Sequence, residues 1–131
     1  MSGTTLSAAA GTTGEAFARP ATTGYFELNS GGAARFTFNL KAGNHEVILT
    51  SKVYKTRQDA LHDIEAVRRN SLIAARFERN VAKDNSPYFV LLADNGQTLG
   101  RSEMYSTRAA MENGIQSVMA HGGSTFVKGL G

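Results

Sequence analysis

The chain has 131 residues, a formal net charge of +3 and no cysteine. This length suits one domain, and the lack of cysteine excludes a disulfide framework, a thiolate nucleophile and a cysteine-based zinc site, which fits a reducing cytoplasm. No apolar run approaches the ~20 residues needed to span a bilayer, and the N-terminus lacks a signal-peptide pattern, so we expect a cytoplasmic protein with no membrane partner. The small positive charge, which is spread along the chain, falls short of the electrostatic footprint of a nucleic-acid-binding protein.

Residues 1–23 consist almost entirely of Ala, Thr, Gly and Ser, with Leu6 and Phe17 as the large apolar side chains beyond Met1. Such a composition cannot bury enough apolar surface to offset the entropy lost on ordering. We therefore expect a disordered tail over 1–23, followed by a single domain over 24–131.

The chain repeats itself. When it is shifted by 51 residues, segment 25–71 aligns with segment 76–122 without a gap. The identical pairs include Phe26 and Phe77, Phe38 and Phe89, Leu40 and Leu91, Tyr54 and Tyr105, and Ile64 and Ile115. This agreement indicates a duplicated unit, with the first copy at about 24–75 and the second at about 76–128. Because each copy is near the lower size limit for independent folding, we expect the two to share one core.

Strand patterns come first in each copy. The side chains of Phe36, Phe38 and Leu40 alternate with polar residues, which is the period-two signature of a half-buried strand. Gly-Asn at 43–44 and Asn-Gly at 95–96 are typical of tight hairpins. The pattern predicts three antiparallel strands before each helix. The ranges read most clearly are 25–29, 35–42 and 46–50 in the first copy and 97–101 in the second.

The sequence Ser-x-x-Tyr-x-Thr-Arg occurs at 51–57 and again at 102–108, each time before a helical pattern. Thr56 and Thr107 stand where a side-chain oxygen can accept a hydrogen bond from the first helical turn, and the tyrosines can pack beneath that turn. The predicted helices are 57–70 and 108–121, and a closing strand is predicted at 124–129. The repeated residues with structural roles are Ser51, Tyr54, Thr56, Ser102, Tyr105 and Thr107.

These motifs resemble the YegP-like family, small bacterial proteins made of a tandemly repeated domain of unknown function. The resemblance covers about residues 24–128 and is carried by four motifs. They are Gly-Tyr-Phe-Glu-Leu at 24–28, the run from Arg35 to Ser51, the Tyr-x-Thr pairs, and Gly-Ile-Gln-Ser-Val at 114–118.

The resemblance implies an α+β fold of two tandem β-β-β-α-β repeats. These share one mainly antiparallel sheet with two helices and exchange their last strands. It implies no catalytic residue. The first copy departs from the family pattern at Asp63 and Ala66, where Gly and Ser are usual. Gly114, inside the second predicted helix, indicates close backbone packing.

Catalytic and metal-site patterns are weak. The histidines His45, His62 and His121 lack the i, i+4 spacing of a helical metal pair and have no companion cysteine. Neither a phosphate-binding loop of the Walker type nor a strand-linked G-x-G-x-x-G is present. We therefore expect no metal, no cofactor and no enzymatic activity, although nucleophile and base need only meet in space.

The leading functional hypothesis is a protein interface. On the strand face opposite the helices the second copy is the more apolar one, because Tyr88, Val90 and Leu92 replace Thr37, Asn39 and Lys41. With Val47 and Leu49, these side chains would form an exposed apolar patch, and such patches mark interaction sites. A homodimer or another protein partner would use it. The alternative is that a strand end, bulge or loop covers these residues.

Two further hypotheses depend on basic residues. Arg57 and Arg108, with the repeated serines and tyrosines, could form two related pockets for an anion, one at each helix N-terminus, unless capping and packing explain these residues without a ligand. The basic excess at the helix-to-strand crossing could contact nucleic acid, although alternation divides it between two faces. Its arginines are Arg68, Arg69, Arg76 and Arg79.

Overall fold

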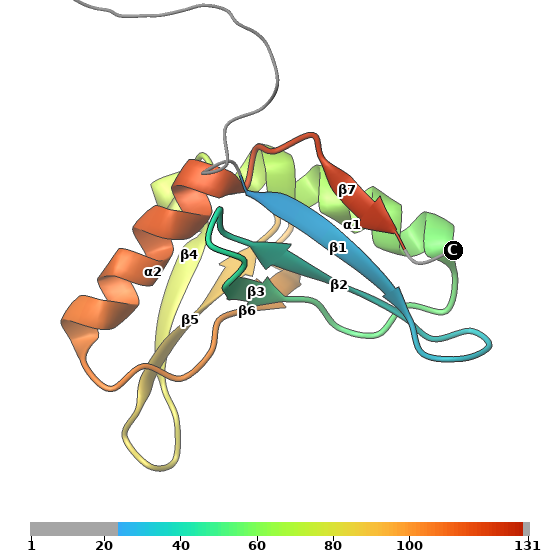
Figure 1. Ribbon diagram of the computed structural model, residues 1–131. Coiled ribbons are helices and arrows are strands. Elements are labelled where there is room, and N and C mark those ends of the chain that lie inside the picture. Colours follow the sequence, from blue (N-terminus) through green and yellow to red (C-terminus); the bar gives the residue numbers. More distant parts are fainter. Residues whose placement is uncertain (1–23, 130–131) are drawn as a thin grey trace, which may run out of the picture.

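The computed structural model describes residues 24–129, which form a seven-stranded sheet and two helices (Figure 1). The predicted tail over 1–23 lies outside the described residues. The strands are β1 (Tyr25–Ser30), β2 (Phe36–Lys41), β3 (Val47–Thr50), β4 (Phe77–Val81), β5 (Pro87–Leu92), β6 (Thr98–Arg101) and β7 (Val127–Gly129). The helices are α1 (Arg57–Asn70) and α2 (Arg108–His121), and a short 3-10 turn, η1 (Ala74–Arg76), precedes β4.

The strand order across the sheet is β4-β5-β6-β3-β2-β1-β7. Neighbouring strands are antiparallel except for β7, which runs parallel to β1. The predicted α+β fold with exchanged last strands is confirmed, since β4 follows α1 but pairs in the second half, and β7 follows α2 but pairs in the first. Both helices also have the predicted bounds.

One hydrophobic core lies between the sheet and both helices. The central strands supply Phe38 and Leu40 from β2 and Phe89 and Leu91 from β5, all fully buried. The helical residues of the same cluster include Ala60, Ile64 and Val67 in α1 and Met111, Ile115 and Val118 in α2. Burying one large apolar side chain contributes about 1.5–3 kcal/mol, so this shared core is the main reason that each helix stays on the sheet.

Each half contains a bulge where its second and third strands pair. In the first half Leu40 of β2 pairs with Leu49 of β3. The next residue of β2 pairs with Val47, which leaves Ile48 as the extra residue. Both Ile48 and Leu49 are buried. Leu49, which we expected beside Val47 on the helix-free face, therefore belongs to the core, and the expectation is wrong for this residue.

The hairpin between β2 and β3 has its left-handed residue at His45, with φ 71°. The equivalent residue in the second half is Gly96, with φ 87°. The dipeptide at 43–44 thus marks the turn without supplying its positive φ, whereas the dipeptide at 95–96 supplies it. Glycine adopts this conformation more readily than histidine, so the second copy has the less strained turn.

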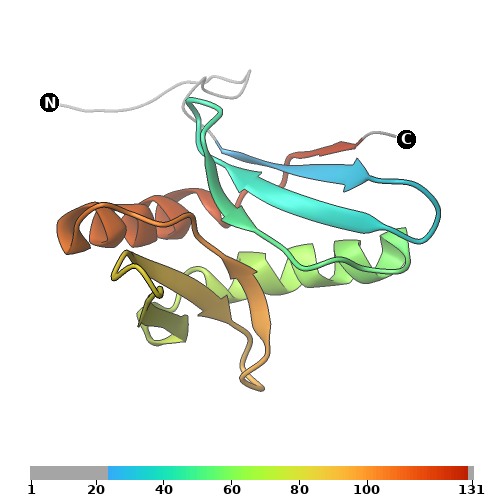
Figure 2. The same ribbon diagram turned by 90° about the horizontal axis from the view of Figure 1, so that it is seen from below.

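The two halves are related by a local twofold axis. Thr50 of β3 pairs directly with Arg101 of β6. These residues are 51 positions apart in the sequence and so occupy equivalent places in the two copies. The same relation joins the helix ends, where Ser71 and Gly122 are the C-caps of α1 and α2. Figure 2 shows the two helices meeting near these ends.

Near such an axis a side chain meets its own counterpart, and two large groups cannot share the space. A Cβ atom added to Gly100 would lie 2.7 Å from the Cγ of Leu49, its equivalent in the first copy. A Cβ atom added to Gly122 would lie 2.4 Å from the Cβ of Ser71. In both pairs one copy supplies a side chain and the other supplies the room for it.

We expect Gly100→Leu to lower the free energy of unfolding by about 1–3 kcal/mol or more, because it overpacks the space that Leu49 fills. Leu49→Gly should also destabilise the protein, by about 3–5 kcal/mol, because it leaves a cavity. The exchanged pair Leu49→Gly/Gly100→Leu should be more stable than the sum of the single effects predicts, by at least about 1 kcal/mol. Urea denaturation of the four proteins measures this coupling.

Gly123→Ala is the matched control, because no atom lies within 4 Å of a Cβ placed there. Its stability should stay within about 0.5 kcal/mol of the wild type. Strict additivity of the two axial substitutions would show that Leu49 and Gly100 do not compete for one space.

Candidate functional site

The serines of the repeated motif are used inside the fold. Ser51 Oγ accepts a hydrogen bond from the N–H of Phe38 at 2.8 Å and donates one to the carbonyl of Lys52 at 2.7 Å. Ser102 makes the same two bonds, with Phe89 at 3.0 Å and Glu103 at 2.8 Å. Each serine therefore joins the residues just after its third strand to the neighbouring second strand.

The threonines cap the helices. Thr56 Oγ1 accepts from the N–H of Asp59 at 3.0 Å, and Thr107 Oγ1 accepts from the N–H of Ala110 at 3.0 Å. An N-cap of this kind contributes about 1 kcal/mol. The helix starts thus already have one of their free N–H groups satisfied.

The two tyrosines stack on phenylalanines of the core but differ in what their hydroxyls meet. Tyr54 stacks on Phe38 with a centroid distance of 6.0 Å, and Tyr105 stacks in the same way on the second-half equivalent at 6.3 Å. Tyr54 donates a hydrogen bond to Asp63 Oδ2 at 2.6 Å. In the second half Asp63 is replaced by Gly114, where an added Cβ would lie 2.2 Å from the Tyr105 hydroxyl oxygen. The glycine thus permits the close packing expected for it.

Burial raises the pKa of both tyrosines. For Tyr54 the hydrogen bond to Asp63 and that carboxylate's charge raise the pKa further. For Tyr105 the second cause is the negative charge of Glu103. Both hydroxyls are therefore held in the protonated form, Tyr54 with a direct acceptor.

The structure separates Arg57 from Arg108. The C-caps of α1 and α2 meet at the local axis, so the helix N-termini, with these arginines, lie at the far ends (Figure 2). Arg57 Nη1 lies 3.7 Å from the position of a Cβ on Gly129 of β7, whereas Arg108 is exposed. Any anion site at these termini would therefore be two separate sites, with no shared pocket.

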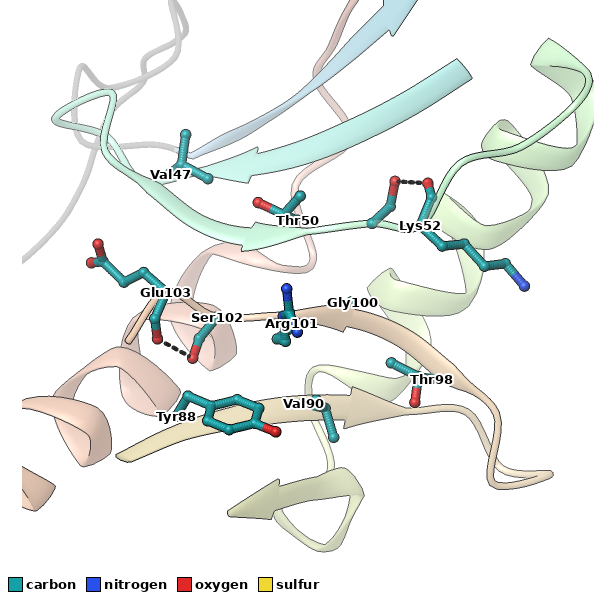
Figure 3. A pocket seen from close by; sticks show the side chains of 11 residues that line it. Val47, Thr50, Lys52, Tyr88, Val90, Thr98, Gly100, Arg101, Ser102 and Glu103 are labelled. Atoms are coloured by element: carbon teal, nitrogen blue, oxygen red, sulfur yellow. Dashed lines mark hydrogen bonds between the residues drawn. The ribbon is translucent and has the colours of Figure 1, made fainter. Parts of the chain in front are cut away.

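A groove of about 650 Å³ lies on the helix-free face of the sheet (Figure 3). We call it the sheet-face groove. Its lining residues are Val47, Thr50, Ser51, Lys52, Tyr88, Val90, Thr98, Gly100, Arg101, Ser102 and Glu103. Three of the residues predicted to form an apolar interface are thus brought together here.

The apolar part of the groove is smaller than the sequence suggested. Val47 is 37% exposed and Tyr88 is partly exposed, but Val90 is only 8% exposed. Leu92 is half-buried and outside the lining, and Leu49 faces the helices. Val47 and Tyr88 therefore offer most of the accessible apolar surface.

Charges of opposite sign stand at the two ends of the groove. Lys52 and Glu103 occupy equivalent places in the two copies, 51 residues apart, and Figure 3 shows them on opposite sides with Arg101 between them. Lys52 Nζ lies 5.4 Å from the centroid of the Tyr54 ring. Arg101 is exposed and forms no ion pair with another residue of 24–129.

Sequence reasoning missed these three charged residues. The signal was present, because the position after the repeated serine is Lys in the first copy and Glu in the second. Recognising a shared groove, however, requires knowing that β3 and β6 are neighbours.

The arginines of the helix-to-strand crossing divide into two groups. Arg68 donates from Nε to the carbonyl of Ser124 at 2.6 Å, forms an ion pair with Glu65 and lies over the ring of Phe26. Arg79 forms an ion pair with Glu112 of α2, with Nη2 and Oε1 2.9 Å apart. This hydrogen-bonded pair raises the pKa of the arginine and lowers that of the carboxyl group.

The other two, Arg69 and Arg76, line a second cavity of about 300 Å³ between α1 and the β5–β6 hairpin. We call it the polar pocket. Its lining residues are His62, Asp63, Ala66, Arg69, Asn70, Ile73, Arg76, Ala93, Asp94, Asn95, Gln97 and Leu99. The predicted basic cluster is therefore not one continuous surface.

The histidines lie apart. His45 Nδ1 is 2.9 Å from the Tyr25 hydroxyl, and His121 Nδ1 is 2.8 Å from the carbonyl of Ser117. His62 lines the polar pocket. Within residues 24–129, no three His, Cys, Asp or Glu side chains gather as metal ligands. In the same part of the chain, no helix is long and apolar enough to cross a membrane.

Known sequences match this chain over most of its length. The profile of a domain of unknown function, DUF1508, matches residues 33–78 and again residues 82–128. A UPF0339 protein of Shewanella oneidensis is 50% identical over 107 residues, which cover 82% of this chain and 97% of that protein. The UPF0339 protein YegP of Yersinia pestis is 42% identical over 107 residues, covering 82% of this chain and 96% of that protein.

Two solution NMR structures have a similar fold. The UPF0339 protein of Shewanella oneidensis superposes with a TM-score of 0.78 at 49% identity, covering 82% of this chain and 92% of that one. YegP of E. coli, described as a protein of unknown function, gives a TM-score of 0.77 at 44% identity, covering 82% and 93%. These descriptions assign no ligand or activity, so chemistry has to be argued from the side chains.

The raised pKa of Tyr54 predicts a loss of stability at alkaline pH. Above about pH 10 a tyrosine in the unfolded chain releases its proton, whereas native Tyr54 keeps it. The unfolded state then binds fewer protons than the native state, so the free energy of unfolding falls as the pH rises. The stability of Tyr54→Phe should fall less steeply with pH than that of the wild type, when urea midpoints are compared between about pH 8 and pH 11.

Asp63→Asn is the companion variant, because it keeps the tyrosine but removes the negative charge beside it. Its slope should lie between those of the wild type and Tyr54→Phe. Identical slopes in all three proteins would contradict a raised pKa at Tyr54.

Proposed function

The chain belongs to the YegP-like family of proteins with two DUF1508 domains, and we propose that its sheet-face groove makes it a self-association module. The occupant of the groove is a second copy of the chain. The observation that carries this proposal is the position of Lys52 and Glu103 at opposite ends of one groove.

A twofold dimer could use these charges well. If two grooves face each other about a twofold axis near Arg101, Lys52 of one copy lies opposite Glu103 of the other, and the reverse pair forms at the other end. The same surface is then complementary to itself in charge. Within one chain the local axis relates the places of Lys52 and Glu103, so the two charges lie at equal distances from the centre of the groove and can pair at both ends of the dimer.

The charges give orientation more than affinity. An exposed ion pair contributes about 0.2–1 kcal/mol, and salt weakens it. Burial of Val47 and Tyr88 supplies the apolar part of the interface at about 25 cal/mol per Å² of apolar surface. Because Val47 and Tyr88 offer most of the accessible apolar surface, we expect a small interface and a weak, concentration-dependent dimer.

The test is the solution mass, measured by light scattering after size exclusion over a range of protein concentrations. The wild type should form a dimer whose dissociation constant rises with salt. Lys52→Glu and Glu103→Lys should each weaken the dimer by about tenfold, since each places like charges opposite one another. The double variant Lys52→Glu/Glu103→Lys should restore it.

Lys83→Glu is the matched control, because Lys83 is exposed and outside the groove, so the dimer should persist. A wild type that stays monomeric at every concentration would contradict self-association and leave the groove to a different protein. A dimer that both single variants leave intact would place the interface elsewhere.

A further inference from the structure

One arginine in the wall of the polar pocket has a buried donor atom without a hydrogen-bond partner. Among the buried side-chain nitrogen and oxygen atoms of residues 24–129, only Arg76 Nε lacks a hydrogen-bond partner. Arg76 is the last residue of η1 and lines the polar pocket together with Arg69 of α1. A guanidinium group cannot lose its charge by deprotonation in a protein, so this donor requires an acceptor.

The protein does not supply that acceptor. Asp63 and Asp94 also line the pocket, but neither forms an ion pair with Arg69 or Arg76 in the described part of the chain. Asp63 instead accepts the hydrogen bond from Tyr54, and Asp94 is exposed on the β5–β6 hairpin.

The fold does not require arginines at these places. At the equivalent places around α2, 51 positions further along the chain, Ala120 and Val127 stand where the polar pocket has Arg69 and Arg76, and Gly43 of the β2–β3 hairpin stands where it has Asp94. The region at the end of α2 thus folds without either guanidinium group. A purely structural role for the two arginines would have to be specific to the region at the end of α1.

The size and charge of the pocket limit the ligand. A volume of about 300 Å³ fits a small molecule and is at the lower end of the range for ligand pockets. The planar Nε and Nη donors of arginine match the oxygens of carboxylate and phosphate groups. The two aspartates in the wall oppose a ligand with many negative charges.

From this geometry we infer that the polar pocket binds the oxyanion group of a small molecule, a carboxylate or a single phosphate, on Arg76 and Arg69. The polar side chains of Asn95 and Gln97, which line the pocket from the hairpin, are placed to contact the rest of such a ligand. This site is separate from the sheet-face groove, so it is independent of the proposed self-association.

The test is a titration of the ¹⁵N-labelled protein with inorganic phosphate and, separately, with acetate, each at constant ionic strength. We expect saturable shifts of the Arg76 Nε–H signal and of the Arg69 and Asn95 amides. The anion with the lower dissociation constant, phosphate or acetate, identifies the ligand group as phosphate or carboxylate. Arg76→Gln should weaken binding at least tenfold, whereas Arg35→Gln, an exposed arginine outside the pocket, should leave it unchanged.

A second readout separates ligand binding from structure. The thermal midpoint of the wild type should rise with concentration of the preferred anion, and that of Arg76→Gln should not. If Arg76→Gln fails to fold, Arg69→Gln provides the same comparison. Shifts that do not saturate at tens of millimolar of either anion, or that persist unchanged in the arginine variants, would overturn the inference.

Discussion

The backbone pairing of Thr50 with Arg101 holds the two copies in one sheet. It is the sole residue pair that the register gives between β3 and β6 in the described chain, and it lies on the local twofold axis. The strand exchange of β7 onto β1, the contact between the helix ends and the continuous core all require the halves to meet in this orientation. Gly100 and Gly122 allow that approach, because each leaves the space that its equivalent fills.

Residues that are identical in the two copies and residues that differ between them have different roles in this protein. The shared Ser, Tyr and Thr of the repeated motif fasten strands, support the helix and cap it, so repetition here reflects folding. The candidate binding features come from positions at which the copies differ. Lys52 of the first copy is replaced by Glu103 in the second, and the residues 51 positions before and after Arg76 are Tyr25 and Val127. The duplicated residues therefore stabilise the fold, and the candidate binding sites lie where the two copies have different side chains.

The sequence predicts where the helices and strands lie better than it predicts which face of the sheet a strand residue occupies. The helices have the predicted bounds because Thr56 and Thr107 mark their starts through local hydrogen bonds. Leu49 was placed on the wrong face because a bulge depends on pairing between strands, which alternation within one strand cannot reveal. The unpaired Nε of Arg76 could not be predicted either, since the residues around it come from α1 and the β5–β6 hairpin, which are distant in sequence and neighbours only in the fold.

Native-state hydrogen exchange tests the central claim, that the two copies form one cooperative core joined at the axis. The slowest amides of β2 and β5 should exchange through the same opening, with equal free energies and equal dependence on denaturant. That result would mean that neither copy unfolds without the other. If β2 or β5 exchanged at a clearly lower free energy while the other stayed protected, the copies would be separate folding units and the account would be contradicted.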